Sequence, residues 1–222
     1  MPPRSGGALN NEIESKVPRR LRYHVAVSLD GFIARPDGSY DWLVADPSID
    51  FAALYKEFDA AVMGRKTYEV GLAAGVDGSI PGMDVTVFSR TLPTSTSRGV
   101  RVTNDDPREV VADLKSKRGG DIWLFGGGEL FRYLLDGGLV DTVELAVMPV
   151  LLGEGIPVLP PGAPTSLVLS DIKQLPSGIV VLAYSVKGTR TAPPTIRFVK
   201  TKAKARRKTG SRVAAKRRGG RR

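Results

Sequence analysis

Residues 121–136 have the sequence DIWLFGGGELFRYLLD, and this stretch decides the fold. After Asp121, residues 122–125 form a short apolar run that predicts a strand at 121–125, and residues 129–136 carry apolar side chains at helical spacing. Three successive glycines join the two segments. A strand, a tight turn and a helix form the first half of a βαβ unit, in which the next strand runs parallel to the first. The stretch therefore predicts an α/β fold.

The same alternation continues on both sides of this stretch. We expect further strands at 21–28, 59–64, 84–89, 99–103, 142–149, 166–174 and 179–186, and further helices at 49–58, 65–72 and 107–118. Ser48 is expected to cap the first helix and Asp106 the third. Only a short Pro-Ser-Gly segment, 176–178, separates the last two strands. The predicted sheet is therefore mixed and mostly parallel, central between flanking helices, with an antiparallel C-terminal hairpin.

The charge of the chain is divided between two regions. The 222 residues contain 33 Lys+Arg and 23 Asp+Glu, a formal charge of +10. From Lys187 onward there are 15 basic and no acidic residues, so residues 1–186 carry 18 basic and 23 acidic ones. We expect a disordered N-terminal extension at 1–19, one domain at 20–186 and a basic disordered tail at 187–222. A basic tail neutralises phosphates, so weak non-specific polyanion binding by the tail is the non-enzyme alternative.

The scarcity of metal-ligating side chains excludes several classes of enzyme. The chain has no cysteine, and its single histidine is His24. Disulfides, thiolate nucleophiles and cysteine-ligated zinc or iron–sulfur sites are therefore excluded, and no metal site is expected. His24 lies in a predicted strand and is expected to be structural. No segment has the roughly 18 apolar residues of a membrane helix, so we expect a cytoplasmic protein without a membrane partner.

Three predicted strand ends are followed by residues that suit phosphate groups. At a helix start, glycines leave backbone N–H groups open to an anion, and cations there oppose the helix dipole unless an anion binds. A turn without a ligand is the alternative for the glycines, and an ordinary surface side chain for Arg90. Ligands of α/β sheets lie beyond strand ends, so the junctions predict one extended polyphosphate ligand, such as a dinucleotide with an extra phosphate. The junctions are Gly126, Gly127 and Gly128; Gly64, Arg65, Lys66 and Thr67; and Ser89 and Arg90.

Several of these segments resemble one known superfamily. YHVAVSLDGFIARPDGSYDW at 23–42, MGRKTYE at 63–69, VFSR at 87–90 and LFGGGEL at 124–130 occur in this order in dihydrofolate reductase-like proteins. The start SLDG at 28–31 and PVLLGEG at 149–155 favour the C-terminal reductase domain of the bacterial riboflavin-biosynthesis deaminase-reductase. The resemblance covers roughly residues 20–186. It implies a dihydrofolate reductase-like fold and an NADPH-dependent reductase, and it suggests a homodimer.

The resemblance also implies roles for the strand-end residues. The nicotinamide of NADPH would lie against Ala26, Ile33 and Ala34, with residues 35–43 forming a loop over the active site. The adenosine phosphate end would lie at the junctions that contain Arg65 and Arg90. The diphosphate would lie at the glycine triplet, next to Glu129 and Leu130.

The substrate side offers fewer signals. Reduction of a C=N or C=C bond is helped by a carboxylic acid, and the candidates are Asp30 and Asp50, with Asp41 as a third. The alternative for Asp30 is ordinary Asp-Gly turn chemistry, and for Asp50 it is a favourable charge at a helix start. Trp42 is expected either to line the substrate pocket or to pack in the core. Gly153 and Glu154 are expected to line the substrate mouth, with a bulged turn as the alternative.

These features together predict a specific activity. The expected function is an NADPH-dependent reduction like that of 5-amino-6-(5-phosphoribosylamino)uracil reductase, acting on a small heterocyclic or sugar-amine substrate. The deaminase step of the bifunctional proteins is excluded, because its zinc site needs cysteines that this chain lacks. The alternative activity is that of a dihydrofolate or other pterin reductase.

Overall fold

Strands and helices alternate along residues 18–188, the part of the chain that the computed structural model describes. The strands are β1 (Leu21–Ser28), β2 (Phe32–Ala34), β3 (Phe58–Gly64), β4 (Asp84–Phe88), β5 (Ser95–Ser97), β6 (Val100–Thr103), β7 (Asp121–Gly126), β8 (Thr142–Met148), β9 (Ile156–Pro157), β10 (Leu167–Gln174) and β11 (Val180–Val186). The helices are α1 (Phe51–Tyr55), α2 (Arg65–Ala73), α3 (Pro107–Ser116) and α4 (Gly128–Asp136).

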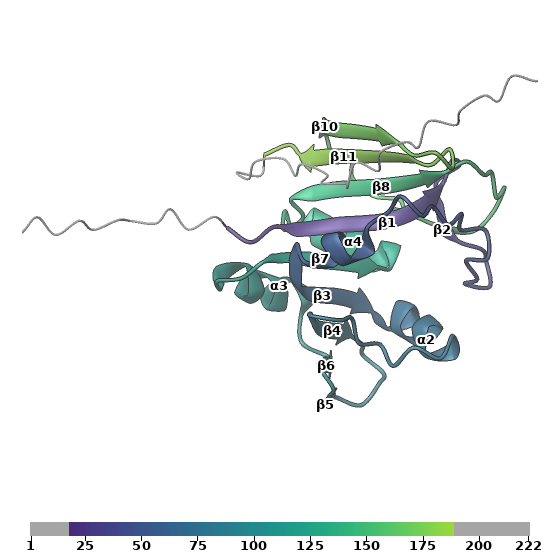
Figure 1. Ribbon diagram of the computed structural model, residues 1–222. Helices are drawn as coiled ribbons and strands as arrows, with labels where there is room; N and C mark the ends of the chain where they lie inside the picture. The colour runs from purple at the N-terminus through teal and green to yellow at the C-terminus, as the bar shows by residue number, and fades with distance from the viewer. Residues whose placement is uncertain (1–17, 189–222) are drawn as a thin grey trace, which may run out of the picture.

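One nine-stranded sheet has the order β10-β11-β8-β1-β7-β3-β4-β6-β5 (Figure 1). From β8 through β1, β7, β3 and β4 to β6, neighbouring strands are parallel. The pairs β8–β11, β10–β11 and β5–β6 are antiparallel. The predicted mixed sheet with its antiparallel C-terminal hairpin is therefore confirmed. The hairpin turns at the expected place, where Leu175 accepts from the Gly178 N–H and donates to Ile179.

Apolar clusters cover both faces of the sheet. On one face, Leu134 of α4 and Val111 of α3 pack against Leu21, Tyr23 and other strand residues. On the other face, α1 and α2 pack over a cluster that includes Met63 and Trp123. The helices therefore lie on both sides of the sheet, as the crossover connections of parallel strands require.

The parallel strands β1 and β7 separate before they end. They pair only at Leu21↔Ile122, Arg22↔Trp123 and Tyr23↔Leu124, whereas β1 pairs with β8 from Arg22 to Ser28. Beyond Tyr23, β1 therefore pairs with a strand on one edge only, among the residues that the structure describes. The split opens the sheet at the carboxyl end of β1.

The first helix is shorter than predicted and has a different cap. The helix expected at 49–58 spans Phe51–Tyr55, and Asp50 is its N-cap, accepting from the Ala53 N–H at 2.9 Å. Ser48 does not cap it, because its hydroxyl donates to Asp46 at 2.6 Å. The prediction was wrong at the C-terminal end since β3 already begins at Phe58, whose side chain is buried.

The third helix matches its predicted start and ends slightly early. Asp106 accepts from the Arg108 N–H at 2.7 Å, which confirms the predicted cap. The helix ends at Ser116 rather than 118, and Gly120 follows in a tight position, where an added Cβ would lie 3.2 Å from the Glu57 carbonyl oxygen. The short strands β2, β5 and β9 were not predicted, because two or three residues carry no measurable periodicity.

The predicted terminal regions fall mostly outside the described residues. This applies to residues 1–17 of the expected extension and 189–222 of the expected tail. Arg19, which was assigned to the extension, is buried, donates to the Gly120 carbonyl at 2.7 Å and pairs with Asp59. Within 18–188, none of the helices combines the length and apolar character needed to cross a membrane.

Candidate active site

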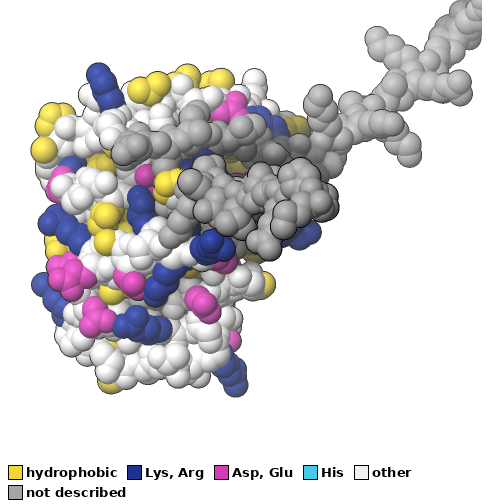
Figure 2. Space-filling model, turned by 90° about the vertical axis from the view of Figure 1, so that its left-hand side faces the viewer, with side chains coloured by type: hydrophobic (Ala, Val, Ile, Leu, Met, Phe, Trp, Pro, Cys, Tyr) yellow, Lys and Arg dark blue, Asp and Glu magenta, His cyan; other side chains and the backbone are white. Residues whose placement is uncertain are grey.

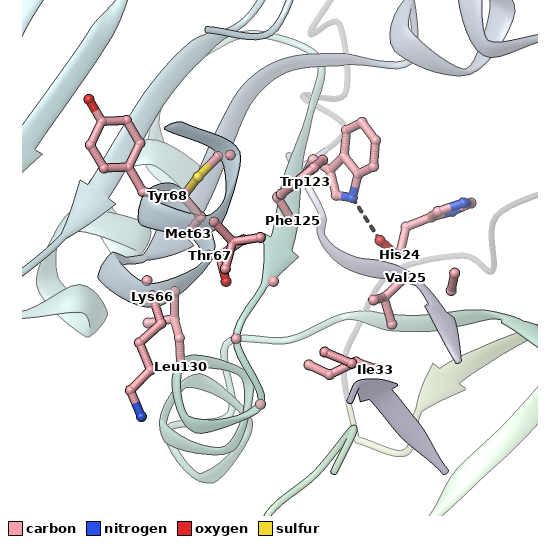
Figure 3. Close-up of a pocket in the computed structure, with 18 of the residues that line it drawn as sticks. His24, Val25, Ile33, Met63, Lys66, Thr67, Tyr68, Trp123, Phe125 and Leu130 are labelled. Atoms are coloured by element: carbon pink, nitrogen blue, oxygen red, sulfur yellow. Dashed lines mark hydrogen bonds between the residues drawn. The ribbon is translucent and has the colours of Figure 1, made fainter. Parts of the chain in front are cut away.

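A cleft of about 1790 Å³ lies where β3, β4 and β7 end and where β1 leaves β7. Figure 3 shows β7 with Trp123 and Phe125 in the middle, Thr67 of α2 on one side and His24 of β1 on the other. The cleft is therefore bounded by the starts of α2 and α4 and by the free edge of β1. All predicted coenzyme-binding residues line it: Ala26, Ile33, Ala34, Gly64, Arg65, Lys66, Thr67, Ser89, Arg90, Gly126, Gly127, Gly128, Glu129 and Leu130.

Two helices begin at the cleft with a glycine as the N-cap. Gly64 precedes α2 and Gly127 precedes α4, and no described side chain caps either helix. Their first backbone N–H groups therefore lack side-chain acceptors within the described structure. A phosphate at either position would accept from these groups and meet the positive end of the helix dipole.

The three glycines at the β7–α4 junction lie in tight local geometry. Gly127 has φ 93°, a conformation that favours glycine. An added Cβ at Gly126 would lie 3.2 Å from Thr67 Cγ2, and one at Gly128 would lie 2.7 Å from the Pro157 carbonyl oxygen. The triplet thus brings α4 close to both α2 and β9. Close packing in a tight turn, the alternative to phosphate binding, therefore explains part of the need for these glycines.

The cations at the cleft differ in how they are paired. Arg65 pairs with Glu69 one helical turn later at 3.1 Å, and Lys66 lies 3.9 Å from Glu129, at the start of α4. Arg90 is exposed and has no ion pair among residues 18–188. Arg90 is therefore the cation of this group that is most available to an added anion.

Ser89 shapes the loop that carries Arg90. Its side chain is buried, and its hydroxyl oxygen accepts from the backbone N–H of Leu92 at 2.8 Å and of Thr91 at 3.2 Å. These bonds form a tight turn directly after β4. The hydroxyl therefore positions Arg90 at the rim of the cleft, through the backbone.

The split between β1 and β7 leaves backbone groups facing the cleft. The Arg20 carbonyl accepts from Ile122 of β7, and the Leu21 carbonyl accepts from Asp141 ahead of β8, so even-numbered residues of β1 face β7. Trp123 Nε1 fills part of the gap by donating to the His24 carbonyl at 2.9 Å (Figure 3). The Ala26 N–H and carbonyl lie one step further on, and no described residue bonds to them.

The predicted substrate-side residues divide into two groups. Asp50 lines the cleft as the N-cap of α1. Trp42 does not line it and packs in the core against Met148 and Ile179. Gly153 and Glu154 also lie outside the lining, so the expectation that they form the substrate mouth finds no support in the geometry.

Asp30 has a structural environment rather than that of a proton donor. Its carboxylate accepts from the Ser28 hydroxyl at 2.6 Å and from the backbone N–H groups of Gly153 and Leu152 at 2.7 and 3.0 Å. The bond from Ser28, followed by those from the two backbone groups, lowers the pKa of Asp30 to about 2. An ionised carboxylate outside the cleft cannot supply the proton, so this prediction is corrected: Asp30 ties the end of β1 to the loop before β9.

Comparison with known proteins identifies the family. The family model of the RibD C-terminal domain matches residues 19–181. This chain belongs to the RibD C-terminal domain family. The uncharacterized protein YyaP of Bacillus subtilis (strain 168) is 31% identical over 182 residues, which cover 77% of this chain and 96% of YyaP.

Solved structures agree with this RibD C-terminal domain assignment. A candidate riboflavin biosynthesis protein from Shewanella sp. PV-4 superposes with a TM-score of 0.65 at 28% identity, covering 76% of this chain and 99% of that one. A dihydrofolate reductase from Enterococcus faecalis, solved with NADP(H), gives a TM-score of 0.55 at 18% identity, covering 77% of this chain and 98% of its own. The dihydrofolate reductase-like fold is thereby confirmed, and the family is that of riboflavin-pathway-type reductases.

One part of the RibD C-terminal domain cleft was missed by sequence reasoning. His24 was expected to be structural, yet it lines the cleft together with Arg22 and Glu144. Glu144 is fully buried and lies directly opposite His24 in the β1–β8 register. The alternation of Arg22 and His24 along β1 places both on one face. This signal was visible in the sequence, but the partner on β8 depends on strand pairing.

Proposed function

We propose that this protein is an NADPH-dependent reductase that acts on a small heterocyclic or sugar-amine substrate, as in the riboflavin-biosynthesis reductases. One observation carries the proposal. Within residues 18–188, two helix starts lack a side-chain cap and Arg90 lacks an ion pair, and these groups face a single cleft together with the open edge of β1. A phosphorylated dinucleotide is the ligand whose groups match this set.

The chain's residues fit NADPH along its length. The start of α4 would hold the diphosphate, and Arg90 with Arg65 and Lys66 would hold the phosphate on the adenosine ribose. The Ala26 N–H and carbonyl present one donor and one acceptor, which matches the carboxamide of a nicotinamide. When bound, the coenzyme would supply a hydride.

The substrate would lie beside the nicotinamide position, against the face with α1. Aromatic side chains form this wall: Trp123 packs 5.7 Å from Tyr55 and 5.0 Å from Phe125, measured between ring centroids. Flat, largely apolar surfaces of this kind suit a planar heterocycle. The alternative substrate class is dihydrofolate or another pterin, and it is supported by Asp50, a carboxylate on the same wall.

Coenzyme preference provides the first test. Replacing Arg90→Ala should remove most of the preference for NADPH over NADH, because a charge-assisted contact contributes about 1.5–3 kcal/mol. Isothermal calorimetry of both coenzymes on the wild-type and variant proteins measures this. Arg98→Ala is a matched control, since Arg98 is exposed and lies outside the cleft lining. Equal affinity of the wild-type protein for the two coenzymes would contradict the assignment of these cations.

Substrate class requires a turnover assay. We expect loss of reduced-nicotinamide absorbance with 5-amino-6-(5-phosphoribosylamino)uracil, and dihydrofolate is the comparison that tests the alternative. Turnover of dihydrofolate alone would support the pterin reductase. Turnover of neither compound, with no NADPH binding by calorimetry, would overturn the reductase proposal.

A further inference from the structure

A buried charge cluster borders the substrate side of the cleft. Arg22 donates from Nε and Nη2 to the two oxygens of Glu144, at 2.8 and 2.7 Å. His24 Nδ1 lies 3.1 Å from Glu144 Oε2, and the Thr142 hydroxyl donates to Glu144 Oε1 at 2.8 Å. The Arg22 and Glu144 side chains are at most 2% exposed, whereas 16% of His24 is exposed. His24 is thus the member of this cluster that best reaches the cleft.

Glu144 fixes the orientation of the histidine. Burial by itself raises the pKa of Glu144, but the hydrogen bonds from Arg22 and His24 outweigh burial and hold that pKa far below its ordinary value. The carboxylate is therefore ionised and can only accept hydrogen bonds, so His24 Nδ1 must carry a proton. Any proton that His24 gains or loses is then on Nε2.

Nε2 is available to a bound molecule. No residue within 18–188 forms a hydrogen bond with it. His24 lies two residues before Ala26 on the same face of β1, and that separation is about 7 Å along a strand. A substrate double bond with its substituents can therefore lie between the proposed nicotinamide position and Nε2 of His24.

The surrounding charges accommodate a protonated histidine. Facing it are Glu144 from β8 and Arg22 from β1, and Arg22 also pairs with Glu57 at 2.5 Å and with Asp121 of β7 at 3.3 Å. Asp121 in turn pairs with Arg20. These groups comprise two cations and three anions, so a protonated His24 makes the cluster neutral. From the α1 side, Asp50 and Tyr55 are the ionisable groups on the same cleft.

We propose that His24, oriented by Glu144, is the proton donor of the reduction. The step rests on the proposed function. The substrate carbon of a C=N bond gains a hydride from the reduced nicotinamide, its π bond breaks, and the released electron pair on nitrogen takes the proton from Nε2. The products are the amine, the oxidised nicotinamide and neutral His24, which regains a proton from water in the open cleft.

The protonation pattern of His24 can be tested without turnover. Because the chain has one histidine, the imidazole nitrogens give a single set of signals in ¹⁵N NMR. We expect the neutral ring to carry its proton on Nδ1, because that nitrogen faces the Glu144 carboxylate. A neutral ring with its proton on Nε2 would overturn the proposal.

The catalytic role is tested with His24→Gln and a matched control. We expect kcat with 5-amino-6-(5-phosphoribosylamino)uracil to fall about 10²–10⁴-fold in H24Q, with NADPH affinity unchanged. Thr142→Val removes another hydrogen bond to Glu144 without removing the acid, so its kcat should fall much less than that of H24Q.

The outcomes separate this proposal from the function on which it rests. Wild-type turnover combined with an unchanged rate in H24Q would refute the role of His24 and leave the reductase standing. A wild-type protein that binds no NADPH and turns over no substrate would refute both.

Discussion

Gly64 and Gly127 occupy equivalent places before α2 and α4 but tolerate side chains differently. Gly64 has φ −82° and ψ 161°, which any residue adopts, and an added Cβ would meet no atom within 4 Å. Gly127 has φ 93°, so a side chain there is strained whatever space is available. Only Gly64 therefore allows the helix start to be blocked without distorting the backbone.

Gly64→Val should lower NADPH affinity while the protein still folds. The valine side chain occupies the space beside the first N–H groups of α2, where a phosphate would bind. We expect a loss of about tenfold or more, comparable with one charge-assisted hydrogen bond. Gly64→Ala should show a smaller effect in the same calorimetric titration. Wild-type affinity in the valine variant, with an unchanged circular dichroism spectrum, would place the phosphate elsewhere.

Glu144 also has a measurable effect on stability. Glu144→Ala leaves the buried Arg22 without its bidentate partner, and breaking a buried ion pair in this way costs about 3–5 kcal/mol. Thr142→Val, which loses one neutral donor to the same carboxylate, should cost only about 0.5–1.5 kcal/mol. Urea unfolding of both variants gives the comparison. Equal losses would mean that Glu144 contributes through packing rather than charge.

At the scale of elements, α3 and α4 are joined at one charged group. Asp106 caps α3 by accepting from the Arg108 N–H and also accepts from the Tyr133 hydroxyl of α4 at 2.9 Å. The bond from Arg108, followed by that from Tyr133, lowers the pKa of Asp106. A carboxyl whose pKa is lowered by folding stabilises the protein above its unfolded pKa, and this stabilisation is lost as the pH falls through the folded value.

Asp106→Asn should therefore change the acid limb of stability. The amide oxygen still caps the helix, so the unfolding midpoint near neutral pH should stay close to that of the wild type. As the pH falls below 3.8, the ordinary pKa of aspartate, the variant should lose less stability than the wild type. Thermal unfolding as a function of pH measures both. Parallel curves for the two proteins would show that Asp106 does not contribute through its charge.

At the scale of the whole molecule, basic and acidic side chains are mixed on the surface of the described domain. Figure 2 shows Lys and Arg side chains interspersed with Asp and Glu on the face that it presents. Residues 1–186 hold 18 basic and 23 acidic side chains, and the excess positive charge begins at Lys187. Coenzyme binding and any polyanion binding are therefore expected to be separable.

Removal of residues 189–222 tests this separation. The shortened protein should bind NADPH as the full chain does, because every proposed coenzyme contact lies within 18–188. It should lose binding to DNA in a mobility-shift assay, and the full chain's binding should weaken steeply with added salt. DNA binding that survives the truncation would assign the polyanion site to the domain. The expected homodimer stays a prediction, and sedimentation of the full chain measures it.

Local sequence patterns were sufficient to predict most of the elements, the family, and the glycine and arginine junctions that line the cleft. Strand 21–28 and the cap at Asp106 depend on neighbours in the chain, so periodicity and capping chemistry were sufficient to predict them. The glycine and arginine junctions could be located for the same reason: each is a contiguous segment at a strand end, and the topology of α/β sheets brings such ends together.

The tertiary structure alone decided the surroundings of His24 and Asp30. His24 acquires its partner because β1 pairs with β8 in one register, and a shift by a single residue would turn it to the opposite face. Asp30 loses its predicted role since the loop at Leu152 and Gly153, more than a hundred residues away, occupies its carboxylate. Pairing between distant strands is set by the packing of the whole core, and no local pattern in this sequence encodes it.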